Sequence, residues 1–525
     1  MGFKTATKMK NTSKDEANTE DMRQASNIPN LASGAITNLF GAVRRTILLF
    51  AYTVFLARTL TASDLGLYFL IFTIINIMGV IAMVGLDFGV VRYVALFAGE
   101  GKFRLVQKTL SAGLFLGIPI SIAVTTAVIV AAPQLSSMVM ESSPVEVTAL
   151  RIFAISIPFW VVARLLNATT QGINLMQYQV YSRDVGEQLS KIIFSVVAVA
   201  FGASLVGVIW ANVASVVLAA TMSLWFVLLA LPRTDRSQPA PSSPAARIFR
   251  YSYPLAFSNI FGIVLAWVDM LLMGYLGTPT DVGYYGAALR LGTGGSVVLL
   301  AFATVFTPVI SDLYNRRRSA ELHILYKTVG RWIFLCSLPI FLVTATLAGP
   351  LMNMFGSEFT AASIALILLA LGQLINASTG TAGLMVLMSG RSKMEMVNVS
   401  AALVVNVVLC FLLIPGLGIV GAAIANAAAA TVINLMRAVE VWIFMRMHAY
   451  DYNYLKPIFA GVIGSLLVFI EQRFVSPGSN LVVIIISAAI LLAVYVILTA
   501  ALGLDKNDKA VLQTIKGRLS RATTS

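Results

Sequence analysis

Long apolar runs follow one another from residue 32 to residue 502, and they constrain this chain more than any other feature of its sequence. A helix needs about 20 apolar residues to cross a bilayer, and a spanning segment is helical because it must satisfy its own backbone hydrogen bonds. The 525 residues are 58% hydrophobic and only 11% charged, which leaves too few polar residues for a globular protein in water. The sequence therefore predicts an all-α, polytopic membrane protein.

We count fourteen such runs, and hence expect 14 transmembrane helices. They are residues 32–57, 66–86, 110–132, 149–170, 187–201 and 205–231, then 253–276, 282–313, 328–347, 361–387, 395–414 and 419–445, then 455–469 and 481–502.

Four short stretches recur in the same order in the second half of the chain, about 220 residues later. The pairs are residues 37–43 with 258–264, 61–68 with 278–285, 166–170 with 375–379, and 206–212 with 420–426. A repeat of this length is too long for a solenoid and is typical of the duplicated halves of a transporter. We therefore expect two six-helix repeats plus two extra C-terminal helices.

This organisation divides the chain into six parts. We expect a disordered cytoplasmic arm at residues 1–31, an N-terminal six-helix lobe at 32–231, a cytoplasmic linker rich in Pro and Ser at 232–250, a C-terminal six-helix lobe at 251–447, two additional transmembrane helices at 448–503 and a cytoplasmic tail at 504–525.

The basic residues indicate the orientation in the membrane. Lys and Arg gather in alternate loops, among them the loop that holds Arg316, Arg317 and Arg318, and basic loops stay on the cytoplasmic side. Both termini are therefore predicted to be cytoplasmic, in the cell inner membrane. The net charge of +14 comes from these scattered loop residues, without a nucleic-acid-binding motif, so we expect no nucleic acid partner.

Residues that could support enzymatic chemistry are few. Cys336 and Cys410 lie inside apolar runs, and the two histidines, His323 and His448, lie outside the membrane core with no metal-ligand spacing. No phosphate-binding loop of the nucleotide-hydrolysing type is present in the sequence. We expect no cofactor, and a protein that is not an enzyme.

Charged residues inside the predicted spans are the candidate functional residues, because such residues usually face a cavity or a partner. Arg44 and Arg45 lie near the middle of the first span; a structural ion pair or a later helix start is the alternative for them. Asp269 and Arg290 lie at similar depth on consecutive antiparallel helices, where a salt bridge between them and a functional role both fit.

Two more arginines lie nearer the cytoplasmic ends of their spans. Arg164 and Arg437 would be exposed by a cavity open to the inside, although Glu440 stands three residues after Arg437 and favours a local ion pair there. The surplus of arginine suits an anion, and the planar guanidinium suits phosphate. The recurring Asn167, Asn376, Asn212 and Asn426 fit both helix packing and substrate contact.

Several motifs between residues 36 and 446 resemble a known family. They are residues 56–60 before 64–68, residues 85–87 with 91–93, residues 281–291, Pro308 with Ser311, residues 387–391 and residues 414–425. As a set, these motifs are similar to polysaccharide transporters of the multidrug/oligosaccharidyl-lipid/polysaccharide exporter superfamily, the group that contains O-antigen flippases.

The resemblance implies two six-helix lobes around a central cavity that opens alternately to each side. It also implies a polyisoprenoid-diphosphate-linked oligosaccharide as substrate, moved from the inner to the outer leaflet for cell-surface polysaccharide biosynthesis. We expect membrane lipids, a polysaccharide polymerase and glycosyltransferases as partners, and a monomer. The alternatives are a drug or cation antiporter of the same fold, a peptidoglycan-precursor flippase, and a polyprenyl-dependent membrane glycosyltransferase.

Overall fold

The computed structural model describes residue 44 and residues 46–139, 143–232, 245–450, 452–474 and 481–502. All regular elements in these ranges are helical, as predicted. Eleven of the helical segments in the described part are long and apolar enough to cross a membrane, and the shorter apolar helix Thr46–Thr59 precedes them. The predicted arm at 1–31, the tail at 504–525 and most of the linker lie outside the described residues.

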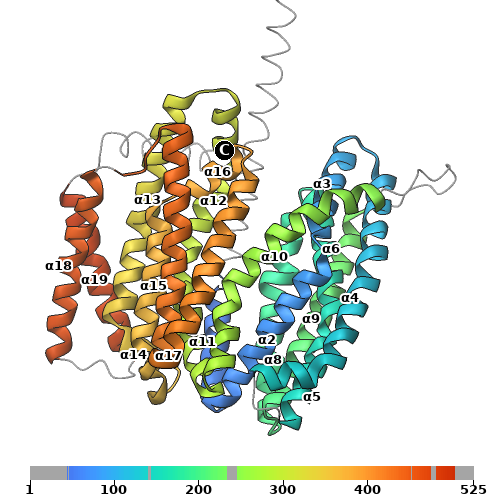
Figure 1. Cartoon of the computed structure of the whole chain (residues 1–525), viewed down its shortest axis with the longest axis horizontal. Coiled ribbons are helices and arrows are strands. Elements are labelled where there is room, and N and C mark those ends of the chain that lie inside the picture. The colour runs from blue at the N-terminus through green and yellow to red at the C-terminus, as the bar shows by residue number, and fades with distance from the viewer. Residues whose placement is uncertain are drawn as a thin grey trace, which may run out of the picture.

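Figure 1 shows the helices gathered in two bundles, with α10 running between them. The N-terminal bundle holds helix Thr46–Thr59, α2 (Ala62–Met83), α3 (Leu86–Gly99), α4 (Phe103–Val139), α5 (Pro144–Ala154), α6 (Ser156–Gly172), α7 (Met176–Gln179), the π-helical segment η1 (Val180–Glu187), α8 (Gln188–Ala200) and α9 (Leu205–Ala230).

The C-terminal bundle follows α10 (Ala245–Leu276). It holds α11 (Pro279–Gly292), η2 (Thr293–Gly295), α12 (Ser296–Asn315), α13 (Ser319–Thr346), α14 (Ala348–Asn353), η3 (Ser357–Ala362), α15 (Ser363–Ser378), α16 (Ala382–Met388) and α17 (Ser392–Met445). After η4 (Tyr452–Tyr454), α18 (Leu455–Phe474) and α19 (Leu481–Ala501) pack on the outer side of this bundle, against α13.

The long element α17 is a hairpin of two antiparallel helices. Gly418 has φ 55° and ψ −131°, outside the helical region, and it breaks the helix at this point. The two arms then lie side by side, because Asn398 on the first arm donates a hydrogen bond to Glu440 on the second at 2.9 Å. The predicted runs at 395–414 and 419–445 correspond to these two arms.

The recurring stretches at 61–68 and 278–285 both begin a helix with the same cap. Thr61 accepts a hydrogen bond from the backbone N–H of Asp64 at 3.1 Å at the start of α2. Thr278 accepts one from the N–H of Asp281 at 3.2 Å at the start of α11, and the Asp281 carboxylate accepts one in return from the N–H of Thr278. The Thr and Asp of each copy therefore fix where its helix begins.

These two equivalent helices cross each other, and the crossing joins the two bundles. A Cβ added to Gly66 on α2 would overlap the carbonyl oxygen of Pro279 and lie 2.9 Å from the N of Gly283 on α11. A Cβ on Gly283 would overlap the carbonyl oxygen of Ala62. Only glycine allows two backbones to approach this closely, and Gly66 and Gly283 occupy equivalent places in the two repeats.

Two further contacts join the bundles. Arg58, in the last turn of helix Thr46–Thr59, donates to the carbonyl oxygens of Met354 at 2.8 Å and Asn353 at 2.9 Å, at the end of α14. The helix α10 packs against α3 with its N-terminal part, where Ser252 lies against Gly85 and Gly89, and against α17 elsewhere. The contact of α2 and α11 is therefore one of several contacts between the bundles.

Replacing Gly66 by alanine tests the crossing. We expect Gly66→Ala to lower the melting temperature of the purified protein in detergent, because relieving the overlap costs about 1–3 kcal/mol. Gly262→Ala on α10 is the matched control, since a Cβ there meets nothing within 4 Å. It should leave the melting temperature unchanged or raise it, because alanine favours a helix by up to about 1 kcal/mol. Equal melting temperatures for both variants would contradict the close approach.

Two serines at opposite ends of α13 test the predicted orientation. Ser319 begins α13 next to the basic residues 316–318, and Ser357 follows α14 beyond the other end; both are exposed. With Cys336→Ala and Cys410→Ala as background, Ser357→Cys should react with an impermeant thiol reagent added to intact cells, and Ser319→Cys only after permeabilisation. Reaction of both before permeabilisation would rule out this orientation.

Candidate functional site

Arg290 lies on α11 with its guanidinium against the N-terminal bundle. Its Cζ is 3.6 Å from the ring centroid of Phe69 and 5.6 Å from that of Phe72, both on α2. Its Nη1 donates to the carbonyl oxygen of Gly286 at 3.4 Å. Within the described ranges no carboxylate forms an ion pair with Arg290. The side chain is thus a half-buried cation between the bundles, stabilised by aromatic faces.

Of the two alternatives for Asp269 and Arg290, the salt bridge between them does not form in the described part of the chain. Asp269 on α10 is fully buried and accepts hydrogen bonds from the hydroxyl of Tyr285 at 2.5 Å and from the amide of Asn426 at 2.7 Å. Tyr285 and Arg290 are five residues apart on α11, so they point about 140° apart around that helix. The face of α11 that meets Asp269 is therefore not the face that carries Arg290.

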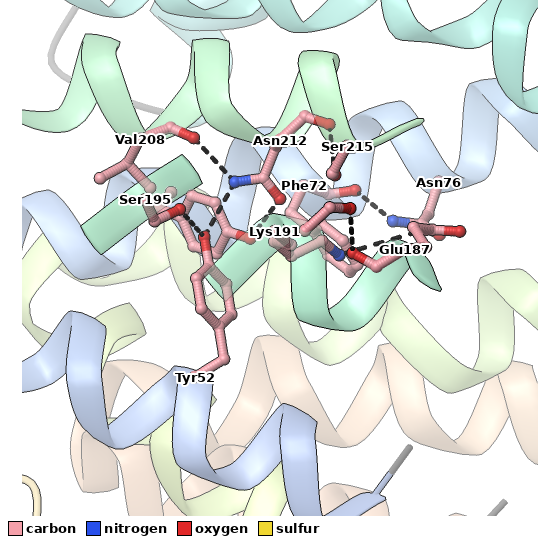
Figure 2. A network of polar contacts seen from close by, with 11 residues as sticks. Tyr52, Phe72, Asn76, Glu187, Lys191, Ser195, Val208, Asn212 and Ser215 are labelled. Atoms are coloured by element: carbon pink, nitrogen blue, oxygen red, sulfur yellow. Dashed lines mark hydrogen bonds and ion pairs between the residues drawn. The ribbon is translucent and has the colours of Figure 1, made fainter. Parts of the chain in front are cut away.

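The N-terminal bundle contains the equivalent polar cluster. Tyr68 and Asn212, which correspond to Tyr285 and Asn426 in the repeat, are joined by a hydrogen bond from the Tyr68 hydroxyl to Asn212 at 3.1 Å. The third partner is Tyr52, whose hydroxyl accepts from the Asn212 amide at 2.9 Å and lies 3.2 Å from the hydroxyl of Ser195. Figure 2 shows this cluster of Tyr52, Ser195 and Asn212.

Lys191 on α8 lies beside this cluster, and it was not among the residues predicted from the sequence. The residue is 5% exposed, and its Nζ is 3.8 Å from Oε1 of Glu187, one turn earlier. The same Nζ is 6.0 Å from the ring centroid of Tyr52 and 5.9 Å from that of Phe72 (Figure 2). The signal in the sequence was a lysine inside the predicted span at 187–201.

The arginines expected near the cytoplasmic side have local partners. Arg164 on α6 stacks on Trp160 with its Cζ 4.5 Å from the ring centroid, and its Nη1 lies 4.0 Å from Oδ2 of Asp87. Arg437 binds Glu395 across the α17 hairpin, with Nε 3.1 Å from Oε2.

The expected pair of Arg437 with Glu440 is therefore wrong. Arg437 binds Glu395, which lies on the other arm of the hairpin. Glu440 instead accepts a hydrogen bond from the amide of Asn398.

The remaining candidates fall at the start of the described chain or within the helix packing. Arg44 is helical and exposed and is the first residue that the structure describes, and Arg45 lies outside the described residues. Asn167 accepts hydrogen bonds from Ser182 at 3.0 Å and Ser223 at 3.3 Å, so this recurring asparagine, like Asn212 and Asn426, links helices within one bundle.

The two equivalent clusters allow a matched comparison of their tyrosines. Tyr285→Phe removes a hydrogen bond to a carboxylate, which contributes about 1.5–3 kcal/mol, whereas Tyr68→Phe removes a bond to a neutral amide, which contributes about 0.5–1.5 kcal/mol. We therefore expect Tyr285→Phe to lower the melting temperature more than Tyr68→Phe. Equal losses would mean that Asp269 is protonated in the folded protein.

Comparison with known proteins agrees with this architecture. The sequence profile of the polysaccharide biosynthesis protein family matches residues 31–314, more than half of the chain, and the MatE profile matches residues 254–412. The chain is 25% identical over 411 residues to a protein named probable low-salt glycan biosynthesis flippase Agl15, from Haloferax volcanii. That alignment covers 77% of this chain and 81% of the relative.

Two solved structures show the same fold. The lipid II flippase MurJ in its inward closed conformation has a TM-score of 0.72 at 16% identity. The superposition covers 90% of this chain and 98% of the MurJ chain. An inward-facing multidrug resistance MATE family transporter of the MOP superfamily has a TM-score of 0.67 at 16% identity, over 77% of this chain and 98% of its own. The resemblance seen in the sequence is confirmed: the chain belongs to the polysaccharide biosynthesis protein family, within the superfamily of multidrug, oligosaccharidyl-lipid and polysaccharide exporters.

Proposed function

We propose that this protein is a flippase that moves a polyisoprenoid-diphosphate-linked oligosaccharide from the inner to the outer leaflet for cell-surface polysaccharide biosynthesis. The observation that carries the proposal is Arg290, a half-buried cation between the two bundles with no ion-pair partner in the described part of the chain. The name of Agl15, a probable flippase of glycan biosynthesis, supports the same class of substrate.

The charge of the substrate explains why the site is cationic. A diphosphate carries at least two negative charges that do not cross about 30 Å of hydrocarbon unaided, whereas its prenyl tail can stay in the lipid. In this proposal Arg44, Arg45 and Arg290 receive the phosphates, and Arg164 and Arg437 line the inner entrance. Because Arg437 is bound to Glu395, its replacement should matter less than that of Arg290.

The movement itself would be alternating access by two six-helix repeats, with two extra helices at the C-terminus. Fourteen spans result when the two arms of α17 are counted separately and helix Thr46–Thr59 and η1 with α8 are added to the eleven long segments. Both termini would then lie on the cytoplasmic side of the cell inner membrane, as the basic loops predict.

The buried carboxylate gives the proposal a candidate coupling residue. Asp269 is fully buried between α10, α11 and α17, and binding of a cation there would change the hydrogen bonds of Tyr285 and Asn426. Glu440, the other acid selected from the sequence, is hydrogen-bonded to Asn398 within the α17 hairpin, so we give it the role of a structural partner.

A drug or cation antiporter of the same fold is the main alternative, and a peptidoglycan-precursor flippase is the second. An antiporter for cations needs carboxylates where the substrate binds, whereas Arg290 and Lys191 occupy the space around Phe72. The protein would act as a monomer, supplied by glycosyltransferases and followed by a polysaccharide polymerase.

Transport in proteoliposomes tests the role of Arg290. Arg290→Gln should lose most of the flipping of a lipid-linked oligosaccharide, measured as accessibility of its headgroup. The substitution removes both the positive charge and the planar guanidinium that can donate two parallel hydrogen bonds to a phosphate. Arg290→Lys should retain part of it. Arg473→Gln is the matched control, since Arg473 also stacks on an aromatic ring, Phe469 at 5.7 Å, but at the end of α18.

The outcome that would refute the phosphate-binding role is full transport by a correctly folded triple variant with Arg44→Gln, Arg45→Gln and Arg290→Gln. A loss of transport in the Arg473→Gln control would show that the assay responds to any missing surface charge.

A further inference from the structure

Lys191 is a buried cation to which the proposed function gives no role. Its Nζ lies at ion-pair distance from Glu187, 3.8 Å, but beyond hydrogen-bond distance. A lysine inside a membrane bundle usually faces a partner or a polar space, because its charge is costly in an apolar surrounding. The question is therefore what else Lys191 faces.

Lys191 and Arg290 flank the same aromatic ring from different bundles. The ring centroid of Phe72 is 5.9 Å from Nζ of Lys191 on α8 and 5.6 Å from Cζ of Arg290 on α11. Phe72 is half-buried and meets Trp267 of α10 edge-on at 6.0 Å, so the ring lies where the bundles face each other. The two charges therefore lie within about 12 Å of each other, and an anion that reaches both lowers their mutual repulsion.

The position of Lys191 is fixed by its surroundings. Ser195 stands one turn after it on α8, and its hydroxyl is hydrogen-bonded to Tyr52. Tyr52 accepts in turn a hydrogen bond from Asn212 of α9. The face of α8 that carries Lys191 is therefore connected to helix Thr46–Thr59 and, through Tyr52, to α9 (Figure 2). A binding residue needs such a fixed position, because its side chain must be held close to the geometry in which it meets the ligand.

We infer that Lys191 and Arg290 form one site for the two phosphates of a lipid diphosphate, with one cation from each bundle. The inference rests on the proposed function and adds a residue to it. A phosphate oxygen accepts charge-assisted hydrogen bonds from the ammonium of Lys191 and the guanidinium of Arg290. Before the ligand arrives, Glu187 holds Lys191, and its carboxylate competes with the phosphate for the same charge.

A site shared by two bundles also links binding to conformation. The ligand bridges Lys191 and Arg290 only when the bundles hold them close to the same ring, as in this structure. It therefore binds this conformation more tightly than one in which the bundles have separated here, and it favours this conformation by the difference in affinity.

Binding of farnesyl diphosphate, farnesyl monophosphate and farnesol to the full-length protein in lipid nanodiscs tests the site by calorimetry. Lys191→Gln should weaken diphosphate binding at least about tenfold and abolish the preference for diphosphate over monophosphate, while Lys191→Arg retains most of both. Glu187→Gln should tighten diphosphate binding, because the competing carboxylate is gone. Lys102→Gln, at an exposed lysine paired with Glu100 at 2.8 Å, is the control and should change nothing.

The outcomes separate the inference from the proposed function. If Arg290→Gln weakens diphosphate binding but Lys191→Gln and Glu187→Gln do not change it, the two-bundle site is wrong and the proposed function stands. If the wild-type protein prefers neither phosphate to farnesol, both are wrong. Should Lys191→Gln fail to fold, Glu187→Gln decides: tighter binding supports the site, and unchanged or weaker binding overturns it.

Discussion

The contact of two glycine backbones is the tightest of the contacts that join the two halves of this protein. At the crossing of α2 and α11 no side chain separates Gly66 from Gly283, and Arg58 and α10 make the further contacts between the bundles. The far end of α2, Met83, lies 17 residues from Gly66, or about 26 Å, so a rotation of about 10° at the crossing would move that end by roughly 4–5 Å. A small change of angle at this contact therefore becomes a large change in the spacing of the bundles elsewhere.

Much of this architecture could be predicted from residue patterns alone. The apolar runs predicted the helical membrane fold, and the recurring Thr-X-X-Asp stretches at Thr61 and Thr278 proved to be helix caps. These features are local, since they depend on hydropathy along one segment or on hydrogen bonds within one turn. Residue number also placed Asp269 well inside a predicted span, and it lies well inside α10.

The partners of the charged residues could not be predicted in this way. Depth does not fix the direction in which a side chain points, and Asp269 therefore meets Tyr285 while Arg290 turns to Phe69. Arg437 binds Glu395 because the α17 chain reverses at Gly418, a contact between residues far apart in sequence. Lys191 was missed because it lies close to the start of the predicted span, at Glu187. In the structure η1 adds about two helical turns before that point, so Lys191 lies deeper in the helix than predicted.

The paired clusters show how the two repeats have diverged. Tyr68 with Asn212 and Tyr285 with Asn426 occupy equivalent places, yet the third member is the neutral Tyr52 in one half and the acidic Asp269 in the other. The tyrosine and asparagine thus form a scaffold that accepts either a neutral or an ionisable group from the first helix of a repeat. At this position the C-terminal half therefore has a fully buried carboxyl group where the N-terminal half has a neutral phenol, so only the C-terminal cluster can gain or lose a proton near neutral pH.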